Sequence, residues 1–465
     1  MSVFFISSHP PRLSGVLTSC VMHHQHKAWI VTVDMGYGHQ RATFPLRDLA
    51  YTDIITANQY PGIPKNDRQI WEKSQYWYEV VSRFKQVPLI GESVFNLYDH
   101  LQEIEPFYPK RDLSKPTLLL KQIDRIIRGG WGKHLIHRLN KRRIPLVTSF
   151  FSTALMADIH GYQGPIYCIV TDADMSRSWV AADPAKSSIR YFAPTYRVAE
   201  RLKLYGVPEE RVFLTGFPLP KENTGKKSEL STIKSDLLQR LSNLDPSRRY
   251  ITQYERTLRE HLGSVPHKRS THPLTIVFAV GGAGAQRELG ETILESLREP
   301  ILKERLKLIV VAGVRKEIRD GIMARAQALG IRHCCGRGFD VLYEKEKFDY
   351  FHSFNRLLRT TDVLWTKPSE LCFYSALGIP IVMAPAVGSQ EKFNKLWMKS
   401  LAAGISQQDP RYVHEWLFDW LDSGWLAEAA MQGFLEAPRH GTYNIETIIN
   451  QHPEQMKQVR TVLQY

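Results

Sequence analysis

Short apolar runs alternate with helical stretches along most of this chain, and that alternation limits the folds open to it more than any other feature. Residues 28–33 predict a buried strand, and a glycine turn and a helix follow it. Further strands are expected at residues 144–148, 166–171 and 212–215, each beside a glycine, proline or aspartate. Strands that alternate with helices of this length predict a parallel, doubly wound sheet.

The second half of the chain repeats this alternation. Strands are expected there at residues 274–280, 306–312, 362–365 and 379–383. Helices are expected between or after them, at residues 286–297, 315–329 and 369–377. Two such series predict an α/β protein made of two domains of similar architecture, each with a doubly wound parallel sheet.

This pattern divides the chain into four segments. We expect the first domain at residues 1–218 and the second at residues 271–410. Residues 219–270 hold few large apolar side chains and more lysine and arginine than acid, which predicts a charged, solvated linker with some helix. Residues 411–465 are expected to be helical.

The chain of 465 residues holds 61 lysines and arginines against 47 acids, a net charge of +14. Such an excess favours an anionic partner such as a nucleotide, a nucleic acid or an acidic membrane. An insertion in the first series, residues 60–143, is rich in aromatic residues up to Tyr108 and in cations from Lys110 onward. We expect no nucleic-acid surface there, because no recognisable binding motif accompanies the cations.

Two explanations of this insertion remain open. Its aromatic side chains can form a helical hairpin that packs against the sheet. Alternatively, they form an interfacial patch in which rings enter the headgroup region of a bilayer and the cations meet anionic lipid. The candidate residues for that membrane patch are Trp71, Trp77, Lys141, Arg142 and Arg143.

The cysteines and the hydropathy exclude several classes of protein. Five cysteines without CxxC spacing argue against a disulfide framework and a zinc site, and no other metal-ligand spacing is present. No apolar run approaches the ~18 residues that a membrane-spanning helix needs. The first residues lack the charged and apolar regions of a signal peptide. We therefore expect a cytoplasmic protein that can lie on the inner face of a membrane without crossing it.

A glycine-rich turn follows the strand expected at residues 274–280. From Gly281 to Gln286 its sequence is Gly-Gly-Ala-Gly-Ala-Gln, and a helix follows. Small residues let backbone N–H groups approach an anion, and the helix N-terminus adds its positive dipole end. The turn departs from the dinucleotide fingerprint, whose third glycine position holds Arg287 here, and it lacks the lysine of a P-loop. A bare glycine turn can also be no more than a tight connection.

Two polar constellations follow later strands of the same series, at residues 366–371 and 388–394. They lie beyond the carboxyl ends of parallel strands, where open α/β sheets bind ligands. Lys367 can form an ion pair with a phosphate group. Taken singly, such residues are more typical of a helix cap or of the surface. The side chains suited to sugar hydroxyls are Glu370, Gln390, Glu391 and Asn394.

The first series offers candidate acid and base groups. The glycine turn after its first strand contains Gly36, Gly38 and His39. His39 is expected at a helix start facing the cleft between the domains. There it can act as a general base or donate a hydrogen bond to a phosphate, although a single histidine more often has a structural role. Asp172 and Asp174 follow a later strand and can act as acid and base, or as caps.

In their order along the chain, these segments resemble the GT-B glycosyltransferases. The most similar branch holds monogalactosyldiacylglycerol synthases, processive diacylglycerol glucosyltransferases and the N-acetylglucosaminyltransferase that makes lipid II. The family's glycine loop of the type GxGHxxA, its Thr-Asp…Trp segment, its Thr-Gly-x-Pro segment and its donor-site series all have counterparts. These counterparts are residues 36–42, 171–179, 215–218, 281–286, 366–368 and 378–380, with Gln390 and Asn394 after them.

The resemblance implies two Rossmann-like domains that face each other across a cleft. The second would hold a nucleotide-diphosphate sugar, usually a UDP-sugar, and the first an acceptor, a glycan or often a lipid at a membrane surface. It implies a hexosyltransferase without metal or cofactor, because loop amides and the helix dipole hold the diphosphate. His39 or Asp172 would take the acceptor proton, with Asp174 as a further candidate. The donor ligands would be Gly282, Gly284, Ala285, Gln286, Arg315, Lys367, Ser369, Glu370, Gln390, Glu391 and Asn394.

Two positions depart from the family's pattern. Ser375 stands where the branch usually carries a glutamate that holds the ribose, and Ser176 stands where it often carries a histidine. These departures leave two other functions open for the same fold. One is a nucleotide-sugar epimerase or hydrolase, and the other is a non-catalytic sensor or scaffold that binds nucleotide sugars.

Overall fold

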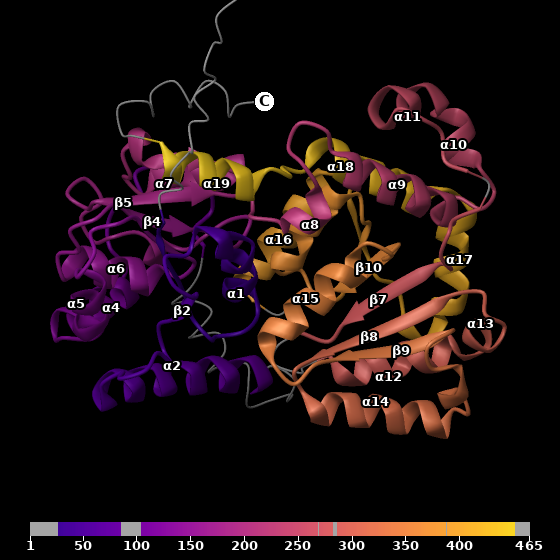
Figure 1. Ribbon diagram of the computed structural model, residues 1–465, viewed down its shortest axis with the longest axis horizontal. Helices are drawn as coiled ribbons and strands as arrows, with labels where there is room; N and C mark the ends of the chain where they lie inside the picture. The colour runs from indigo at the N-terminus through magenta and orange to yellow at the C-terminus, as the bar shows by residue number, and fades with distance from the viewer. Residues whose placement is uncertain (1–26, 85–103, 268, 282–285, 387, 452–465) are drawn as a thin grey trace, which may run out of the picture.

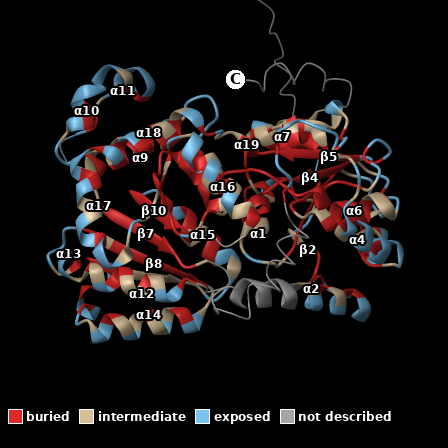
Figure 2. Cartoon of the chain, turned by 180° about the vertical axis from the view of Figure 1, so that it is seen from behind, coloured by how far each residue is buried: buried red, intermediate tan, exposed pale blue. Residues whose placement is uncertain are grey.

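The computed structural model describes residues 27–84, 104–267, 269–281, 286–386 and 388–451, with residues 75–84 described as helical backbone alone. Two α/β domains lie side by side, each built around one parallel sheet (Figure 1). Figure 2 shows that the strands of both sheets are buried, whereas the exposed residues lie mainly on the outer helices.

The first sheet holds six parallel strands in the order β2-β1-β3-β4-β5-β6. The strands expected in this half are all present. Sequence patterning misses β2, which is two residues long, and β5, whose apolar run is interrupted by Arg190. The bounds are β1 (Trp29–Thr32), β2 (Ile55–Thr56), β3 (Leu146–Thr148), β4 (Ile166–Ile169), β5 (Ile189–Ala193) and β6 (Val212–Leu214).

The second sheet is also six-stranded and parallel, in the order β12-β11-β10-β7-β8-β9. Its expected strands are present, and β9 and β12 are additional. Two such sheets confirm the predicted fold class of two Rossmann-like domains. The bounds are β7 (Thr275–Ala279), β8 (Lys307–Gly313), β9 (Phe339–Tyr343), β10 (Val363–Thr366), β11 (Ile381–Met383) and β12 (Gly404–Ser406).

The described part of the aromatic insertion of the first domain is largely helical, and its aromatic residue Trp71 packs inward. Trp71 is 3% exposed, and its ring lies 4.7 Å from that of Trp131. Trp71 is therefore a core residue, and the prediction that it belongs to a membrane patch is wrong. Trp77 lies in the part of α2 whose side chains fall outside the described residues. In the described part of this domain the α-helices are α1 (Gly38–Thr43), α2 (Lys65–Phe84), α4 (Leu118–Arg128), α5 (Lys133–Leu139), α6 (Phe151–Ile159) and α7 (Tyr196–Leu204).

The helices of the second domain follow the predicted pattern except at residues 369–377. That stretch is a 3-10 helix, η5 (Glu370–Leu377), which ends at Gly378 with a positive φ of 70°. A left-handed residue at this position favours glycine and stops the helix. The remaining helices are α12 (Arg287–Ser296), α13 (Arg298–Leu302), α14 (Lys316–Ala328), α15 (Lys347–Leu358) and α16 (Ser389–Ser400).

Residues 219–270 are not the solvated linker that their composition predicts. Leu237, Leu241 and Leu244 form a buried stripe at helical spacing that packs into the core of the second domain. Arg240, on the same helix, is buried and donates to the carbonyl of Thr361 at 2.6 Å. The helices of this segment are α8 (Lys221–Thr224), α9 (Ser231–Leu244), α10 (Arg249–Gln253) and α11 (Glu255–Leu262).

The C-terminal helices tie the two domains together. α17 (Val413–Asp422) and α18 (Trp425–Glu436) pack on the second domain, and α19 (Gly441–Asn450) returns to the first (Figure 1). Asn444 Nδ2 donates to the carbonyl of Thr215 at 2.9 Å. The chain thus crosses twice between the domains. None of the helices in the described part of the chain is long and apolar enough to cross a bilayer.

Candidate functional site

The loops at the carboxyl ends of the two sheets meet between the domains. The loops after β1 and β4 carry His39 and Asp172, and the loops after β10 and β11 lead to Lys367 and Asn394. Hydrogen bonds and an ion pair join the two sides directly. Because open parallel sheets bind ligands at this edge, the junction between the two domains is the candidate site.

Asn394 links the two domains through both polar atoms of its side chain. Its Oδ1 accepts from the backbone N–H of Ala173 at 2.7 Å. Its Nδ2 donates to Asp172 Oδ1 at 2.9 Å and to the carbonyl of Pro368 at 3.2 Å. The residue is 1% exposed. In this arrangement Asn394 therefore holds Asp172 in place and is not free to bind a sugar hydroxyl.

Asp172 has a pKa suited to proton transfer. Burial raises its pKa to about 6, although the hydrogen bond from Asn394 lowers it. The carboxylates of Glu370 and Glu391 raise it further, and Lys367 lowers it. A carboxyl group that titrates near neutral pH can take a proton and return it.

His39 lies in the first turn of α1 and is held in one tautomer. Its Nδ1 lies 2.8 Å from the carbonyl oxygen of Ser149, which accepts, so Nδ1 carries the proton and Nε2 has a free lone pair. Burial lowers the pKa of His39 to about 4, so the ring is neutral at pH 7. The rings of Phe150 and Trp179 lie 4.7 and 6.3 Å away. Nε2 can therefore accept a hydrogen bond, while a pKa of about 4 makes the ring a weak base at neutral pH.

Arg41, two residues after His39, is a site residue that sequence reasoning missed. It is 2% exposed, and its Nε lies 3.2 Å from Glu370 Oε1 across the cleft. Its Nη2 donates to the hydroxyl of Tyr350, and its guanidinium lies 4.2 Å from the ring centre of Phe354. Arg41 belongs to the glycine loop at residues 36–42, and its place in that loop is the sequence feature that could have indicated a site residue. Glu370, predicted as a donor ligand, is thus occupied by an arginine of the other domain.

Gly36 and Gly38 shape the loop that carries these contacts. Gly36 has a φ of +88°, which favours glycine. At Gly38, a Cβ would lie 3.1 Å from Glu370 Oε2, so the absence of a side chain lets the glutamate approach. Between them, the hydroxyl of Tyr37 accepts from the backbone N–H of Val314 at 3.1 Å. The loop after β1 therefore contacts the second domain.

Lys367 lies beside Gly281, the residue at which the glycine turn after β7 begins. A Cβ on Gly281 would lie 3.7 Å from Lys367 Cε, and Lys367 Nζ pairs with Glu391. Gln286, just before α12, is 8% exposed, and its Oε1 has no hydrogen-bond partner among the described residues. A cation beside a helix N-terminus suits a phosphate group. The predicted Gly282, Gly284 and Ala285 lie outside the described residues.

The remaining donor candidates follow other strands of the second sheet. Arg315 is half-buried at the N-cap of α14 and pairs with Glu317 at 3.7 Å. Ser369 stands at the N-cap of η5, and Gln390 lies in the first turn of α16, both partly buried. They follow the carboxyl ends of β8, β10 and β11, so the structure brings these candidates to one edge of the second sheet.

Asp174 does not face the cleft as an acid or base. Its carboxylate accepts from Arg201 Nε and Nη2, each at 2.9 Å, and from Arg197 Nε at 2.9 Å. Asp174 and Arg201 are both fully buried. Arg197 and Arg201 thus occupy both oxygens of the Asp174 carboxylate inside the first domain, which corrects the prediction of a catalytic role for this residue.

The cationic residues predicted for the membrane patch lie at the opposite edge of the first sheet. Lys141, Arg142 and Arg143 are exposed and stand in the turn just before β3, at its amino end. The guanidinium of Arg142 lies 4.3 Å from the ring centre of Tyr51. These cations are accessible to an anionic partner, but they do not line the cleft.

The two serines that depart from the family's pattern are buried. Ser375 is 0% exposed, its Oγ has no hydrogen-bond partner among the described residues, and its backbone packs against Gly433 of α18. Ser176 Oγ lies 2.7 Å from Ser178 Oγ. Position 375 thus faces α18 and not the cleft, so a longer side chain there would meet the helix.

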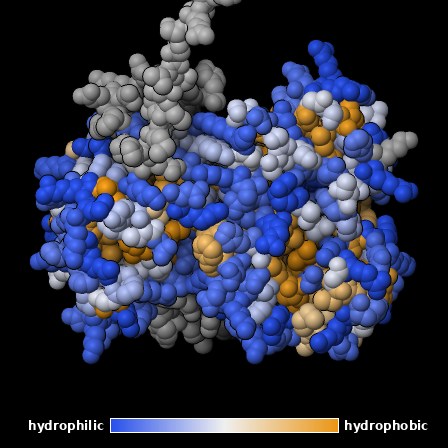
Figure 3. Space-filling view, viewed as in Figure 1, coloured by the Kyte–Doolittle hydropathy of each residue, from blue (hydrophilic) through white to orange (hydrophobic). Residues whose placement is uncertain are grey.

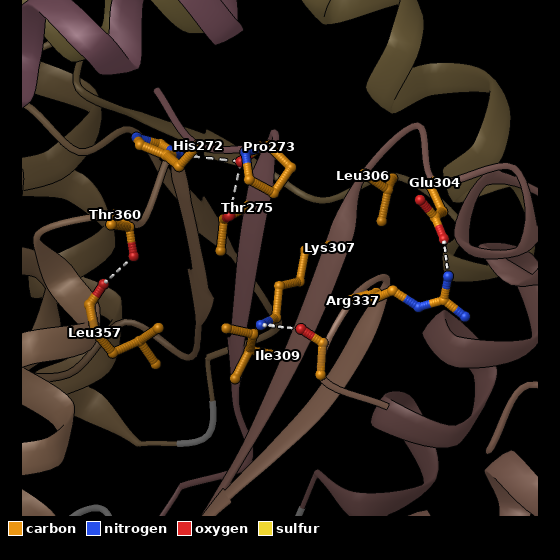
Figure 4. A pocket seen from close by; sticks show the side chains of 11 residues that line it. His272, Pro273, Thr275, Glu304, Leu306, Lys307, Ile309, Arg337, Leu357 and Thr360 are labelled. Atoms are coloured by element: carbon orange, nitrogen blue, oxygen red, sulfur yellow. Dashed lines mark hydrogen bonds and ion pairs between the residues drawn. The ribbon is translucent and has the colours of Figure 1, made fainter. Parts of the chain in front are cut away.

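A hollow of about 460 Å³ lies elsewhere on the second domain. It is lined by Thr275 and Lys307 at the amino ends of β7 and β8, away from the cleft (Figure 4). The polar groups drawn there pair with one another; Lys307 Nζ, for example, donates to the carbonyl of Gly336 at 3.1 Å. Figure 3 shows hydrophobic residues over this part of the domain. Among the described residues, no cluster of three or more histidines, cysteines and acids is placed to hold a metal.

The fold and these contacts define a two-domain α/β protein whose two parallel sheets meet near their carboxyl ends. A family model described as a domain of unknown function, DUF6938, matches residues 328–443. The chain is 22% identical to the processive diacylglycerol beta-glucosyltransferase of Bacillus cereus (strain AH187) over 401 residues, 83% of each chain. It is 20% identical to the protein of the same name from Bacillus cytotoxicus over 261 residues, and there it spans 53% of the relative's length.

Solved structures show weaker likeness. The crystal structure of MurG from Acinetobacter baumannii has a TM-score of 0.46 and 12% identity, covering 92% of this chain and 100% of the other. The UDP-GlcNAc 2-epimerase from Neisseria meningitidis has a TM-score of 0.40 and 13% identity, covering 78% and 88%. The strand orders, and not these scores, define the fold. The chain resembles the GT-B glycosyltransferases of the diacylglycerol glucosyltransferase branch, as its motif order predicts.

Proposed function

We propose that this protein is a glycosyltransferase that moves a hexosyl group from a nucleotide-diphosphate sugar, a UDP-sugar, to a hydroxyl of a lipid-linked acceptor. The observation that carries the proposal is the Asn394–Asp172 contact, which places a carboxyl group of near-neutral pKa beside the Lys367 loop of the other domain. The relatives named processive diacylglycerol beta-glucosyltransferase support the sugar donor and the lipid acceptor.

The acceptor hydroxyl must lose a proton in this reaction. The bond from the anomeric carbon to the diphosphate oxygen breaks, and a bond from that carbon to the acceptor oxygen forms. Asp172 is the candidate base whose pKa lies nearer to neutral pH, where a base is most effective. His39 Nε2 is the second candidate, and its lone pair can accept a hydrogen bond from the same hydroxyl.

The nucleoside diphosphate leaves with added negative charge. Lys367, beside Gly281, and the N-terminus of α12 would supply positive potential to the diphosphate, so the proposed chemistry uses no metal. The glycine turn that includes Gly282, Gly284 and Ala285 would hold the phosphates. Gln286, whose Oε1 lacks a partner among the described residues, would bind the donor beside it.

The membrane part of the proposal rests on charge. Residues 110–143 carry most of the chain's excess of cations, and Lys141, Arg142 and Arg143 are exposed. Cations attract a protein to the anionic cytoplasmic face of a membrane, where a lipid acceptor resides.

Sugar-nucleotide binding is the first test. A panel of UDP-, GDP-, ADP- and dTDP-sugars is examined by thermal shift, in which a ligand at ~100 times its Kd stabilises by about 2.7 kcal/mol. We expect a UDP-sugar to raise the Tm. Asp172→Asn should keep this shift and abolish transfer to diacylglycerol in vesicles, whereas Asp183→Asn, an exposed aspartate of the same domain, should keep both. Absence of a shift with every sugar nucleotide contradicts the proposal.

A second function has one observation in its favour. The carboxylates of Glu370 and Glu391 both act on Asp172, so three carboxyl groups share the cleft. An epimerase or hydrolase of nucleotide sugars can use such carboxyl groups as acid and base. Incubation with the donor alone distinguishes the two, because turnover without acceptor indicates an epimerase or hydrolase. Binding without any turnover indicates a scaffold.

A further inference from the structure

Lys367, the cation expected to meet the donor phosphates, already has a carboxylate partner. Its Nζ pairs with Glu391 Oε1, and Glu391 lies in the first turn of α16. The side chain of Glu391 is 13% exposed and that of Lys367 is 26% exposed, so the pair is largely withdrawn from solvent. Salt screens a pair of this burial less than it screens a surface pair. A diphosphate that binds Lys367 must therefore compete with Glu391.

Glu391 belongs to a carboxylate cluster, formed by Asp172, Glu370 and Glu391, at the junction between the domains. Burial raises the pKa of Asp172 most, and the carboxylates of Glu370 and Glu391 raise it further. The pKa of the buried Cys372 thiol in η5 is raised by burial and then by the same three acids. Groups on both domains thus sense the same carboxylates, so the three acids lie close together.

Two cations pair with the three acids of this cluster. Arg41 Nε lies 3.2 Å from Glu370 Oε1, and Lys367 pairs with Glu391. Asp172 accepts instead from a neutral side-chain amide at 2.9 Å. The three carboxylates thus hold two cations between them, and their sum is an excess of one negative charge.

The charged groups nearby do not change this balance. Lys347 of α15 pairs with Asp34 of the first domain, and Arg315 before α14 pairs with Glu317 at 3.7 Å. His39 is neutral at pH 7, because burial lowers its pKa to about 4. Each of these pairs sums to zero, so the cluster keeps its negative charge.

A sugar nucleotide brings further negative charge to this cluster. A diphosphate bound by Lys367 takes the cation away from Glu391, which removes that counter-charge from the carboxylate acting on Asp172. Like charges that share a site cannot both stay fully ionised, so such a pair binds a proton. The first turn of α16 and the adjacent, exposed Lys392 favour an ionised Glu391 while Lys367 is in place. The exchange of partners therefore draws its proton from solvent.

We propose that Glu391 is a positioning residue that holds the ammonium group of Lys367 until the donor diphosphate replaces it, and that the carboxyl pair of Glu391 and Asp172 then takes up a proton. An O–H bond forms on one carboxylate oxygen, and Lys367 keeps its charge throughout. The other carboxylate of the pair stays ionised, so a base remains for the acceptor hydroxyl. This inference rests on the proposed sugar-nucleotide donor, and it adds that donor binding weakens as the pH rises.

Titration calorimetry of the full chain with UDP-glucose measures the proton directly. The diphosphate of this probe is esterified on both sides and carries no group that titrates near neutral pH, so the protein binds any proton taken up. At pH 7 the slope of the observed enthalpy against the ionisation enthalpy of the buffer gives the number of protons. We expect about 0.5 proton or more for the unaltered chain and less than about 0.2 for Glu391→Gln. Glu428→Gln, which changes an exposed first-turn glutamate of α18, should keep the uptake of the unaltered chain.

The affinities of two variants test the exchange of partners itself. UDP lacks the sugar, so its Kd at pH 8, where its terminal phosphate is ionised, reports the phosphate contact alone. Glu391→Gln removes the competitor for Lys367 and should bind UDP about threefold more tightly. Lys367→Met should bind UDP at least about tenfold more weakly. If Glu391→Gln does not fold, Glu391→Ser replaces it, because serine is also favoured at a helix start.

Binding of UDP-glucose without proton uptake, or with equal uptake in Glu391→Gln, overturns the inference and leaves the proposed transferase standing. Weaker binding of UDP by Glu391→Gln also overturns it, because a merely structural role for Glu391 would have that effect. Absence of binding with every sugar nucleotide rejects the proposed function, and the inference falls with it. Proton uptake that depends on Glu391, without transfer to diacylglycerol, upholds the inference and rejects transfer.

Discussion

Asn394 Nδ2 of the second domain donates to Asp172 Oδ1 of the first at 2.9 Å, and the same amide accepts from Ala173 and donates to the carbonyl of Pro368. The same hydrogen bonds therefore orient the candidate base and hold the two domains together. Separating the domains would expose the Asp172 carboxyl group and remove the hydrogen bond that lowers its pKa.

Asn394→Ala should impair catalysis more than donor binding. The loss leaves the Ala173 N–H and the Asp172 carboxylate without their buried partner, which costs about 1–3 kcal/mol of unfolding free energy. We expect kcat to fall at least about tenfold, and the pH midpoint of kcat/KM to move upward because the hydrogen bond lowers the Asp172 pKa. Lys399→Ala, exposed on the same helix, is the control. An unchanged pH midpoint contradicts the positioning role.

The raised pKa of Asp172 predicts opposite pH trends for catalytic activity and for the free energy of unfolding. As a base it must be ionised, so kcat/KM should decline below about pH 6. Its folded-state pKa of about 6 is raised above the ordinary 3.8, so its contribution to stability is present below about pH 4 and is lost as the pH rises through about 6. Asp172→Asn should flatten that part of the stability profile measured by urea unfolding. A profile that keeps its slope in the variant assigns the titration to another group.

Arg41 and Glu370 should behave as a coupled pair between the domains. Arg41→Met leaves a poorly exposed carboxylate without its cation, and breaking such a pair costs about 3–5 kcal/mol. The double variant Arg41→Met with Glu370→Gln should recover at least half of that loss. A double-mutant cycle on the unfolding free energy measures the coupling, and strictly additive losses would show that the two side chains do not interact.

Gly313 should not tolerate a side chain while Tyr37 is present. Its φ is +66°, and a Cβ would lie 2.4 Å from the Tyr37 hydroxyl oxygen. Gly313→Ala is expected to cost about 1–3 kcal/mol from overpacking and backbone strain. Combining it with Tyr37→Phe removes the clash with the hydroxyl and should recover part of the loss in thermal unfolding. No recovery would mean that the strained φ, and not Tyr37, is responsible.

The local sequence pattern predicts most of the strands of this protein. Apolar runs beside glycine turns predict β1, β3, β4, β6, β7, β8, β10 and β11, because buried parallel strands need continuous apolar residues on both faces. The same pattern indicates the edge of each sheet where polar loops gather. Patterning fails where a strand is short or polar, as at β2 and β5. It also fails at α9, where composition hides an apolar stripe.

The partners of the polar side chains are decided by the tertiary structure. Asp172 and Asp174 are two residues apart, yet one meets Asn394 and the other meets Arg197 and Arg201. The sequence by itself determines that both carboxyl groups follow a strand, whereas packing decides which one faces the cleft. Trp71 is buried and Arg41 is paired for the same reason: burial and pairing depend on residues distant in the chain, which no local pattern contains.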